Sequence, residues 1–357
     1  MPAMITAATM EAPMPCYDVH LVGSIPLENA TQVFETVARL LGPKAPRIPD
    51  GETGARLEWM GWLEPLFSTH PQFENTGESM FRGYTSYRYR ARAGVPLDAV
   101  RFDNLRHAAI AIESYREFAR LKAAGTIPAR TRFLFPIAHP ITPIWRFIAE
   151  EQRDALGPRY QEALLAEVDK MCAAIPHDEF AIQWDCASQI FRTLQVAEPT
   201  RYGRSKAEML ENLSRWCAAL GERVPAKVDL IYHLCYGSAQ NRHSIEPIDM
   251  GDMVEMANRI SAGVTRRIAL FHMPVPVDRS DPAYFEPLRR LKLRGDTRLS
   301  LGLVHFTDGV PGTRRRLATA EKYARDFLIA TECGFGRYPP DSVAKVLAVH
   351  AELAGRG

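Results

Sequence analysis

Short apolar runs alternate with longer amphipathic stretches along most of the 357-residue chain. Runs such as residues 131–136 and 299–304 have the length and composition of buried strands, and stretches such as 28–41 and 108–121 repeat apolar residues at helical spacing. Strand and helix alternate roughly eight times without a Gly/Ser-rich linker, so we predict an α/β protein with a single (β/α)₈ TIM barrel. A doubly wound sheet is the alternative, but no Gly-rich dinucleotide fingerprint follows the first strand.

Two segments depart from this alternation. Residues 81–92 (FRGYTSYRYRAR) alternate aromatic with polar side chains, which predicts a short β-hairpin inserted at the barrel rim. The chain starts MPAMITAATMEAPMP, without the basic start and long apolar core of a secretion signal. We therefore expect residues 1–16 to form a flexible tail and residues 17–357 to form one catalytic barrel domain.

Composition narrows the function class. The hydrophobic share of 46% and charged share of 24% are those of a soluble globular protein. A formal net charge of +2 gives no general case for nucleic acid or an anionic membrane, and no apolar run approaches the ~20 residues of a membrane span. Six scattered cysteines argue against a disulfide framework and for a reducing compartment, so we expect a cytoplasmic protein. The oligomeric state stays open.

A His-x-Cys pair closes the apolar run that begins at residue 229. His233 and Cys235 are two residues apart, so on a strand they point to the same face and offer an imidazole and a thiolate, two ligand types that zinc prefers. Cys333 follows the last strand, and His272 closes another strand. Because strand ends meet at one face of a barrel, we predict a zinc ion held by these residues, with His272 as fourth ligand. Taken singly, each also fits a buried cysteine or a hydrogen-bonded histidine.

Further polar residues lie at strand ends. His305, followed by Asp308, is a candidate general acid/base with a nearby carboxylate. Glu52 and Asp185 could hold a substrate ammonium group or cap helices. Ser24, after a glycine, could offer its hydroxyl and backbone N–H to a carboxylate.

The Pro-rich stretch 137–145 is predicted to be a loop beside the same site. It contains Trp145, a candidate stacking platform for a substrate, although tryptophan is more often a core residue. It also contains His139, which we count among the substrate-binding positions.

Seven short motifs, taken in order, resemble the C-terminal catalytic barrel of cobalamin-independent methionine synthase, within the wider uroporphyrinogen decarboxylase-like barrel group. They are VGSIP at 22–26, DGE at 50–52, PITPIW at 140–145, IQWD at 182–185, HLCY at 233–236, LVH at 303–305 and ECG at 332–334. The resemblance implies that Ser24 contacts the carboxylate of homocysteine and that Glu52 and Asp185 hold its amine. It also implies that Trp145 stacks on folate and that His305 donates a proton. The implied zinc ligands are His233, Cys235 and Cys333.

Three departures from that family limit the prediction. His272 stands where the family has a glutamate zinc ligand, which makes the expected site net neutral. His139 stands where the family has glycine and narrows that side of the pocket. The resemblance does not extend to the family's N-terminal folate-binding half, which leaves the alkyl donor open.

We therefore predict a zinc-dependent methyl or alkyl transferase acting on a small thiol such as homocysteine. One alternative is a zinc-dependent lyase or hydrolase of the same barrel group with a thiol-free substrate. Another is a non-enzymatic barrel that binds a metal or a tetrapyrrole.

Overall fold

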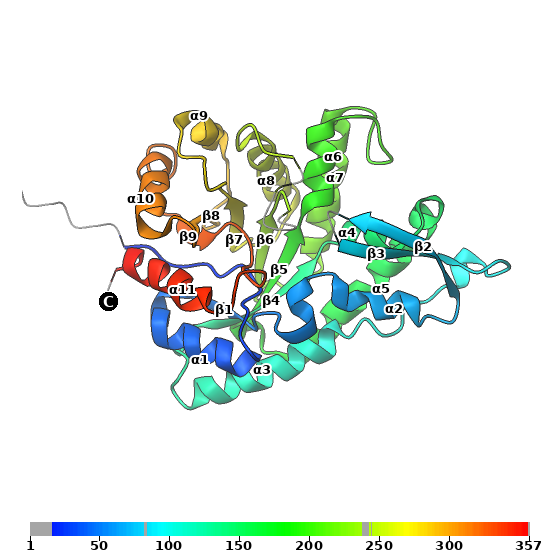
Figure 1. Ribbon diagram of the computed structural model, residues 1–357, viewed down its shortest axis with the longest axis horizontal. Helices are drawn as coiled ribbons and strands as arrows, with labels where there is room; N and C mark the ends of the chain where they lie inside the picture. The colour runs from blue at the N-terminus through cyan, green and yellow to red at the C-terminus, as the bar shows by residue number, and fades with distance from the viewer. Residues whose placement is uncertain (1–15, 82–83, 238–242, 244, 356–357) are drawn as a thin grey trace, which may run out of the picture.

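A curled parallel sheet forms the centre of the computed structural model, which describes residues 16–81, 84–237, 243 and 245–355 (Figure 1). Seven strands are hydrogen-bonded in the order β1–β4–β5–β6–β7–β8–β9, and each neighbouring pair is parallel. The strands are β1 (Arg47–Pro49), β4 (Arg132–Ala138), β5 (Phe180–Cys186), β6 (Asp229–Leu234), β7 (Leu270–Pro274), β8 (Arg298–Val304) and β9 (Leu328–Thr331). The expected flexible tail, apart from Cys16, lies outside the described residues.

The apolar pattern of YDVHLV at 17–22 predicts a short first strand, but in the structure this segment is held by isolated contacts. Val19 forms a single parallel bridge with Ile329 of β9, and the His20 N–H donates to the Ile329 carbonyl at 2.9 Å. On the other side, the Val19 N–H donates to the carbonyl of Lys44, just before β1, at 2.7 Å. The segment therefore contacts both edges of the sheet. A TIM-barrel-like arrangement is confirmed, whereas a closed eight-stranded barrel is not, since this segment forms no continuous ladder.

Amphipathic helices cover the outside of the sheet (Figure 1). In the first of them the Asn29 side chain caps the start by accepting from the Gln32 N–H at 3.0 Å. The same helix buries Phe34, whose ring meets Phe118 edge-on, with centroids 5.4 Å apart. The helices of at least seven residues are α1 (Ala30–Leu41), α3 (His107–Ala123), α4 (Ile141–Phe147), α5 (Arg153–Ala174), α6 (Ser188–Val196), α7 (Lys206–Glu222), α8 (Gly251–Gly263), α10 (Gly309–Ala320) and α11 (Ser342–Leu353).

The predicted hairpin is present but longer than expected. It pairs β2 (Phe73–Phe81) with β3 (Tyr84–Ala91) in antiparallel register, and it projects to one side of the sheet (Figure 1). The prediction missed most of β2 because its sequence, FENTGESMF, does not alternate cleanly and contains a bulge at Gly77. The Tyr89 carbonyl accepts from the Ala149 N–H at 2.9 Å, which joins the hairpin to the segment after α4.

Two predictions of local structure were wrong. Residues 141–147 form helix α4 rather than a loop, because Pro140 is its N-cap and Pro143 lies in its first turn, where a missing N–H costs little. The amphipathic pattern at 56–67 predicts one helix, but the structure has two 3₁₀ turns before α2 (Glu64–Ser68), with Trp59 at a φ of 53° between them. Among the described helices, none has the length and apolar character needed to cross a membrane.

Three arginines surround one buried aspartate at the amino ends of the strands, opposite the ends where the candidate site lies. Asp229 pairs with Arg47 at 2.5 Å, Arg267 at 3.0 Å and Arg132 at 3.5 Å. Burial by itself would raise the pKa of Asp229, but the three guanidinium groups outweigh it and hold the pKa below its ordinary value. The network ties β1, β4, β6 and the segment before β7 together.

Candidate metal centre

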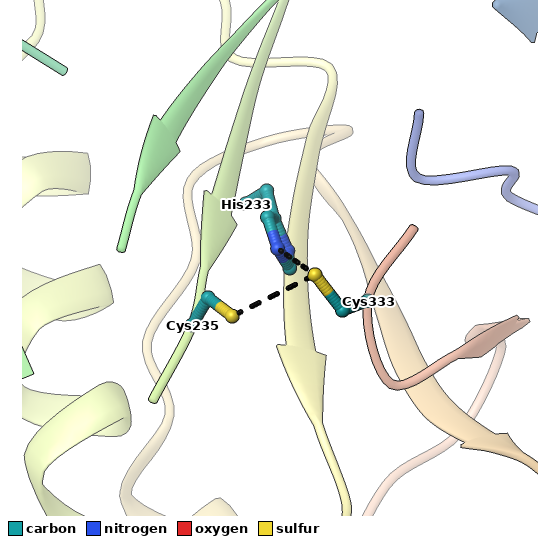
Figure 2. Close-up of side chains that lie close together, drawn as sticks. All are labelled: His233, Cys235 and Cys333. Atoms are coloured by element: carbon teal, nitrogen blue, oxygen red, sulfur yellow. Dashed lines mark hydrogen bonds between the residues drawn. The ribbon is translucent and has the colours of Figure 1, made fainter. Parts of the chain in front are cut away.

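Three metal-binding side chains converge at the carboxyl ends of β6 and β9. Figure 2 shows His233, Cys235 and Cys333 pointing toward one another, the first two from the end of β6 and the third from the turn after β9. The Sγ atom of Cys333 lies 3.7 Å from Nε2 of His233 and 3.9 Å from Sγ of Cys235. The three donor atoms lie within 4.8 Å of one another, and His233 and Cys235 are buried. The sequence prediction that these residues meet agrees with this geometry.

Two of the three donor separations fit a tetrahedral zinc ion, and the third, between His233 and Cys235, is within 4.8 Å. With Zn–S bonds of about 2.3 Å and Zn–N bonds of about 2.0–2.1 Å, tetrahedral ligands are separated by about 3.8 Å for two sulfurs and about 3.6 Å for sulfur and nitrogen. The observed separations of 3.9 and 3.7 Å are close to both values. Two thiols and an imidazole are also the soft and borderline donors that favour zinc over magnesium or calcium.

The two thiols are electrostatically different. The hydrogen bond from Cys235 lowers the pKa of Cys333 well below its ordinary value, and the same bond raises the pKa of Cys235. Burial opposes a charge on His233, but the neighbouring Cys333 sulfur outweighs burial and raises the pKa of the imidazole. Cys333 is therefore the more acidic of the two thiols.

His272 contacts the Nδ1 side of the His233 ring and is not one of the three donors. Its Nδ1 is 2.7 Å from Nδ1 of His233, and its Nε2 is 3.1 Å from the carbonyl oxygen of Thr331. The structure does not bring His272 to the sulfur atoms, and its role as the fourth zinc ligand stays a prediction.

A cavity of about 160 Å³ opens beside the three donors. It is lined by His233, Cys235 and Cys333 and also by Ser24, Glu52 and Asp185, the three predicted contacts of an amino acid. All of these side chains reach the cavity from strand ends or the turns that follow. The structure therefore brings six of the predicted site residues into one small space.

Two buried carboxyl groups form one wall of the cavity. Burial raises the pKa of Glu52 to about 8 and that of Asp185 to about 7, with Arg56 and His233 respectively opposing the shift. Glu52 has a φ of 46°, and its N–H donates to Asp50 at 3.0 Å. A cationic group bound between the two carboxyls would favour their charged forms.

Gln183 orients Asp185. Its side-chain amide donates to Asp185 Oδ1 at 2.8 Å and to the Val22 carbonyl at 2.6 Å, and its oxygen accepts from Nε2 of His20 at 3.0 Å. Burial lowers the pKa of His20 to about 3, so this ring is neutral. The sequence prediction missed Gln183 and His20, although Gln183, two residues before Asp185, shares its face of the strand.

Close packing of two turns fixes Ser24 against the Cys333 turn. The Ser24 carbonyl accepts from the Phe335 N–H at 2.9 Å, and its Oγ accepts from the Gly336 N–H at 3.2 Å. A Cβ atom on Gly334 would lie 2.4 Å from Ser24 Oγ and 2.8 Å from the Ser24 backbone nitrogen. Only glycine fits at position 334.

Gly334→Ala is therefore expected to displace the Cys333 turn, to destabilise the protein by about 1–3 kcal/mol and to weaken metal binding. Thermal unfolding and zinc titration measure the two effects. Gly157→Ala is the matched control. Gly157 lies within helix α5, and a Cβ atom there would meet only Ile144, at 3.8 Å, so this substitution is expected to be neutral or stabilising. Unchanged zinc affinity in Gly334→Ala would contradict the packing argument.

Besides His272, four predicted site residues do not line the cavity, and their roles stay predictions. Nε2 of His305 donates to the Val275 carbonyl at 2.8 Å, and Asp308 pairs with Arg316 at 2.8 and 2.9 Å. Nδ1 of the buried His139 accepts from the Ile141 N–H at 3.2 Å. The fourth is Trp145. The Arg153 guanidinium lies over its ring, 5.6 Å from the ring centroid.

The sequence prediction also missed several lining residues. Trp59, rather than Trp145, lines the cavity and hydrogen-bonds to Asp185. Arg146 from α4 and Arg337 from the turn after β9 bring two positive charges to the lining, and Glu58 adds a third carboxyl group. Arg146 directly follows Trp145, so the motif lies in a segment that contributes to the lining.

Comparison with known proteins adds information about the fold. No protein-family model matches the chain, and no curated protein matches its sequence. A B12-independent methionine synthase from Shewanella sp. W3-18-1, solved in complex with selenomethionine, is similar with a TM-score of 0.58 and 14% identity, over 95% of this chain and 97% of that one. A putative vitamin-B12 independent methionine synthase from Listeria monocytogenes is similar with a TM-score of 0.55 and 12% identity, over 96% and 98% of the two chains. At these identities the likeness shows that the chain shares the fold of these proteins.

Proposed function

We propose that this chain is a zinc-dependent alkyl transferase that activates a small amino thiol such as homocysteine. The observation that carries the proposal is the convergence of His233, Cys235 and Cys333 with two buried carboxyl groups in one cavity. The shared fold supports a methyl transfer, and the Shewanella protein is described with selenomethionine, an analogue of a methylated thiol.

The cavity matches a substrate of amino-acid size. Its volume of about 160 Å³ is below the roughly 300–1,000 Å³ of pockets that enclose drug-sized ligands. Glu52 and Asp185 would hold the ammonium group, and Ser24 would contact the carboxylate. Arg146 and Arg337 would add positive charge for an anionic group of either substrate.

The three donors define where the thiol reacts. When bound there, zinc would lower the pKa of a substrate thiol so that it is a thiolate at neutral pH. The carboxyl pair would fix the other end of the substrate and so orient its sulfur. The sulfur lone pair would attack the electrophilic carbon of the donor, forming the S–C bond as the bond to the leaving group breaks, and a proton would be delivered to that group. His305 is the predicted source of that proton.

The proposal predicts about one zinc per purified chain and formation of an S-alkylated product from homocysteine and a methyl donor. Asp185→Asn should lower kcat/KM for homocysteine by about 10- to 100-fold, because a charged hydrogen bond of about 1.5–3 kcal/mol is lost. A thiol without the amine is the control, since it should be insensitive to the substitution. Product analysis by mass spectrometry and metal analysis provide the measurements. A chain that binds no zinc and alkylates no thiol would contradict the proposal.

A zinc-dependent lyase or hydrolase is the second candidate. It is favoured by the two carboxyl groups in the same cavity as the metal donors, since a carboxylate beside a metal-bound water is a common general base. Turnover of a thiol-free substrate without thiol alkylation would favour it.

A further inference from the structure

We propose that His272 is a positioning residue rather than a metal ligand: it holds His233 in the form that presents Nε2 to the metal, which leaves the fourth coordination position to the substrate thiol. The inference rests on the proposed metal site. It concerns two buried residues that are direct neighbours on parallel strands, His233 of β6 and His272 of β7.

The available donors and acceptors determine the direction of each hydrogen bond. The Thr331 carbonyl can only accept, so the Nε2 atom of His272, 3.1 Å away, carries a proton. His272 is fully buried, and its hydrogen-bond partners in the described structure are a carbonyl and another imidazole, neither of which would offset a positive charge, so the neutral ring with a lone pair on Nδ1 fits this environment. That Nδ1 lies 2.7 Å from Nδ1 of His233, which must therefore donate.

The consequence for His233 is a defined metal-binding atom. With a proton held on Nδ1, the other nitrogen, Nε2, is the one that faces Cys333 at 3.7 Å. If His233 is doubly protonated in the metal-free protein, the proton beside His272 stays and the one facing the sulfur leaves when a metal binds. In both protonation states His272 selects Nε2 as the ligand atom, a role that hydrogen-bonded partners of ligating histidines commonly have.

The same arrangement argues against His272 as a ligand. Both of its ring nitrogens are engaged, one by His233 and one by Thr331. The Thr331 contact also links the two parts of the donor group, because the Thr331 hydroxyl donates to the Cys333 carbonyl at 2.7 Å. His272 thus connects the histidine ligand to the turn that carries the cysteine ligand.

Two substitutions separate positioning from ligation. In His272→Asn, the amide oxygen can still accept from Nδ1 of His233, whereas His272→Leu keeps similar bulk and removes the acceptor. We expect His272→Leu to lose about 10- to 100-fold in zinc affinity and His272→Asn to retain most of it. The visible spectrum of the cobalt-substituted protein should keep the same band positions in wild type and both variants, since two thiolates and one imidazole remain bound. A band shift common to both variants would overturn the inference.

Two measurements on the wild-type protein complete the test. X-ray absorption of the zinc-loaded protein without thiol should show one imidazole, and two would overturn the inference. In the metal-free protein, ¹H–¹⁵N spectra of the histidine side chains should show His272 protonated on Nε2 and His233 on Nδ1; a proton on Nδ1 of His272 would also overturn it. Because the last measurement needs no metal, a wild-type chain that fails to bind zinc would contradict the proposed function without deciding this inference.

Discussion

Cys333→Ala is expected to abolish tight zinc binding. The substitution removes the central sulfur of the donor group, 3.7 Å from the imidazole and 3.9 Å from the other thiol, and leaves two ligands. Loss of a hydrogen-bonded partner of a ligand already costs about 10- to 100-fold in affinity, so loss of a ligand should cost more than about 100-fold. Competition with a chromogenic chelator measures the affinity.

Cys172→Ala is the matched control for that substitution. Cys172 is a buried cysteine on α5, away from the donor group, so its removal should leave the affinity unchanged. Equal affinities for wild type and Cys333→Ala would remove Cys333 from the site. A loss in Cys172→Ala as large as that in Cys333→Ala would attribute the effect to general damage to the fold.

Asp229→Asn is expected to destabilise the protein by about 3–5 kcal/mol, the usual cost of removing one partner from a buried ion pair. Asp229 is almost fully buried, and its charge compensates Arg47, Arg132 and Arg267 at the amino ends of the strands. Without it, three guanidinium groups would repel one another in a poorly solvated place. The midpoint of urea unfolding at neutral pH measures the effect.

The exposed Asp296 provides the control, because it also pairs with Arg267, at 2.6 Å, but with 68% of its side chain exposed. Asp296→Asn should cost no more than about 1 kcal/mol. The pH dependence has a definite sign: the pKa of Asp229 is lowered on folding, so its contribution is complete above about pH 4 and is lost as the pH falls below that value. A stability difference between wild type and Asp229→Asn that grows below pH 4 would contradict this assignment.

Strand positions were the most predictable part of the site. His233 and Cys235 share a face because strand side chains alternate, and Asp185 and Glu52 reach the cavity because the first lies at the carboxyl end of β5 and the second follows β1. These placements need only local periodicity and the rule that parallel strands end at one face.

Helical geometry explains why Arg146 rather than Trp145 lines the cavity. The segment was read as a loop, but it is helix α4, in which successive side chains are rotated by about 100°. A shift of one residue therefore exchanges a side chain that lines the cavity, Arg146, for one that does not. Trp59 lies in the region predicted as a regular helix, where the broken turns direct it to Asp185 instead.

The local sequence pattern could not predict which distant residues form hydrogen bonds with one another. Asp308 was predicted as the carboxylate near His305, and its charge does act on His305, while its carboxylate forms two hydrogen bonds to Arg316. Similarly, the sequence places His272 at a strand end beside His233 but gives no information on which ring nitrogen meets which neighbour. Both outcomes depend on the three-dimensional positions of the side chains.

The packing of Ser24 on the Cys333 turn has a consequence for folding. The bond between Ser24 and Gly336 joins residues 312 positions apart, and the segment before Ser24 bridges β9 at a similar separation. Contacts of such high sequence separation form slowly, because a long loop must close first. We therefore expect the cavity to be completed only after the two edges of the sheet have met. Tight binding at the proposed zinc site would then require that the whole sheet has already assembled.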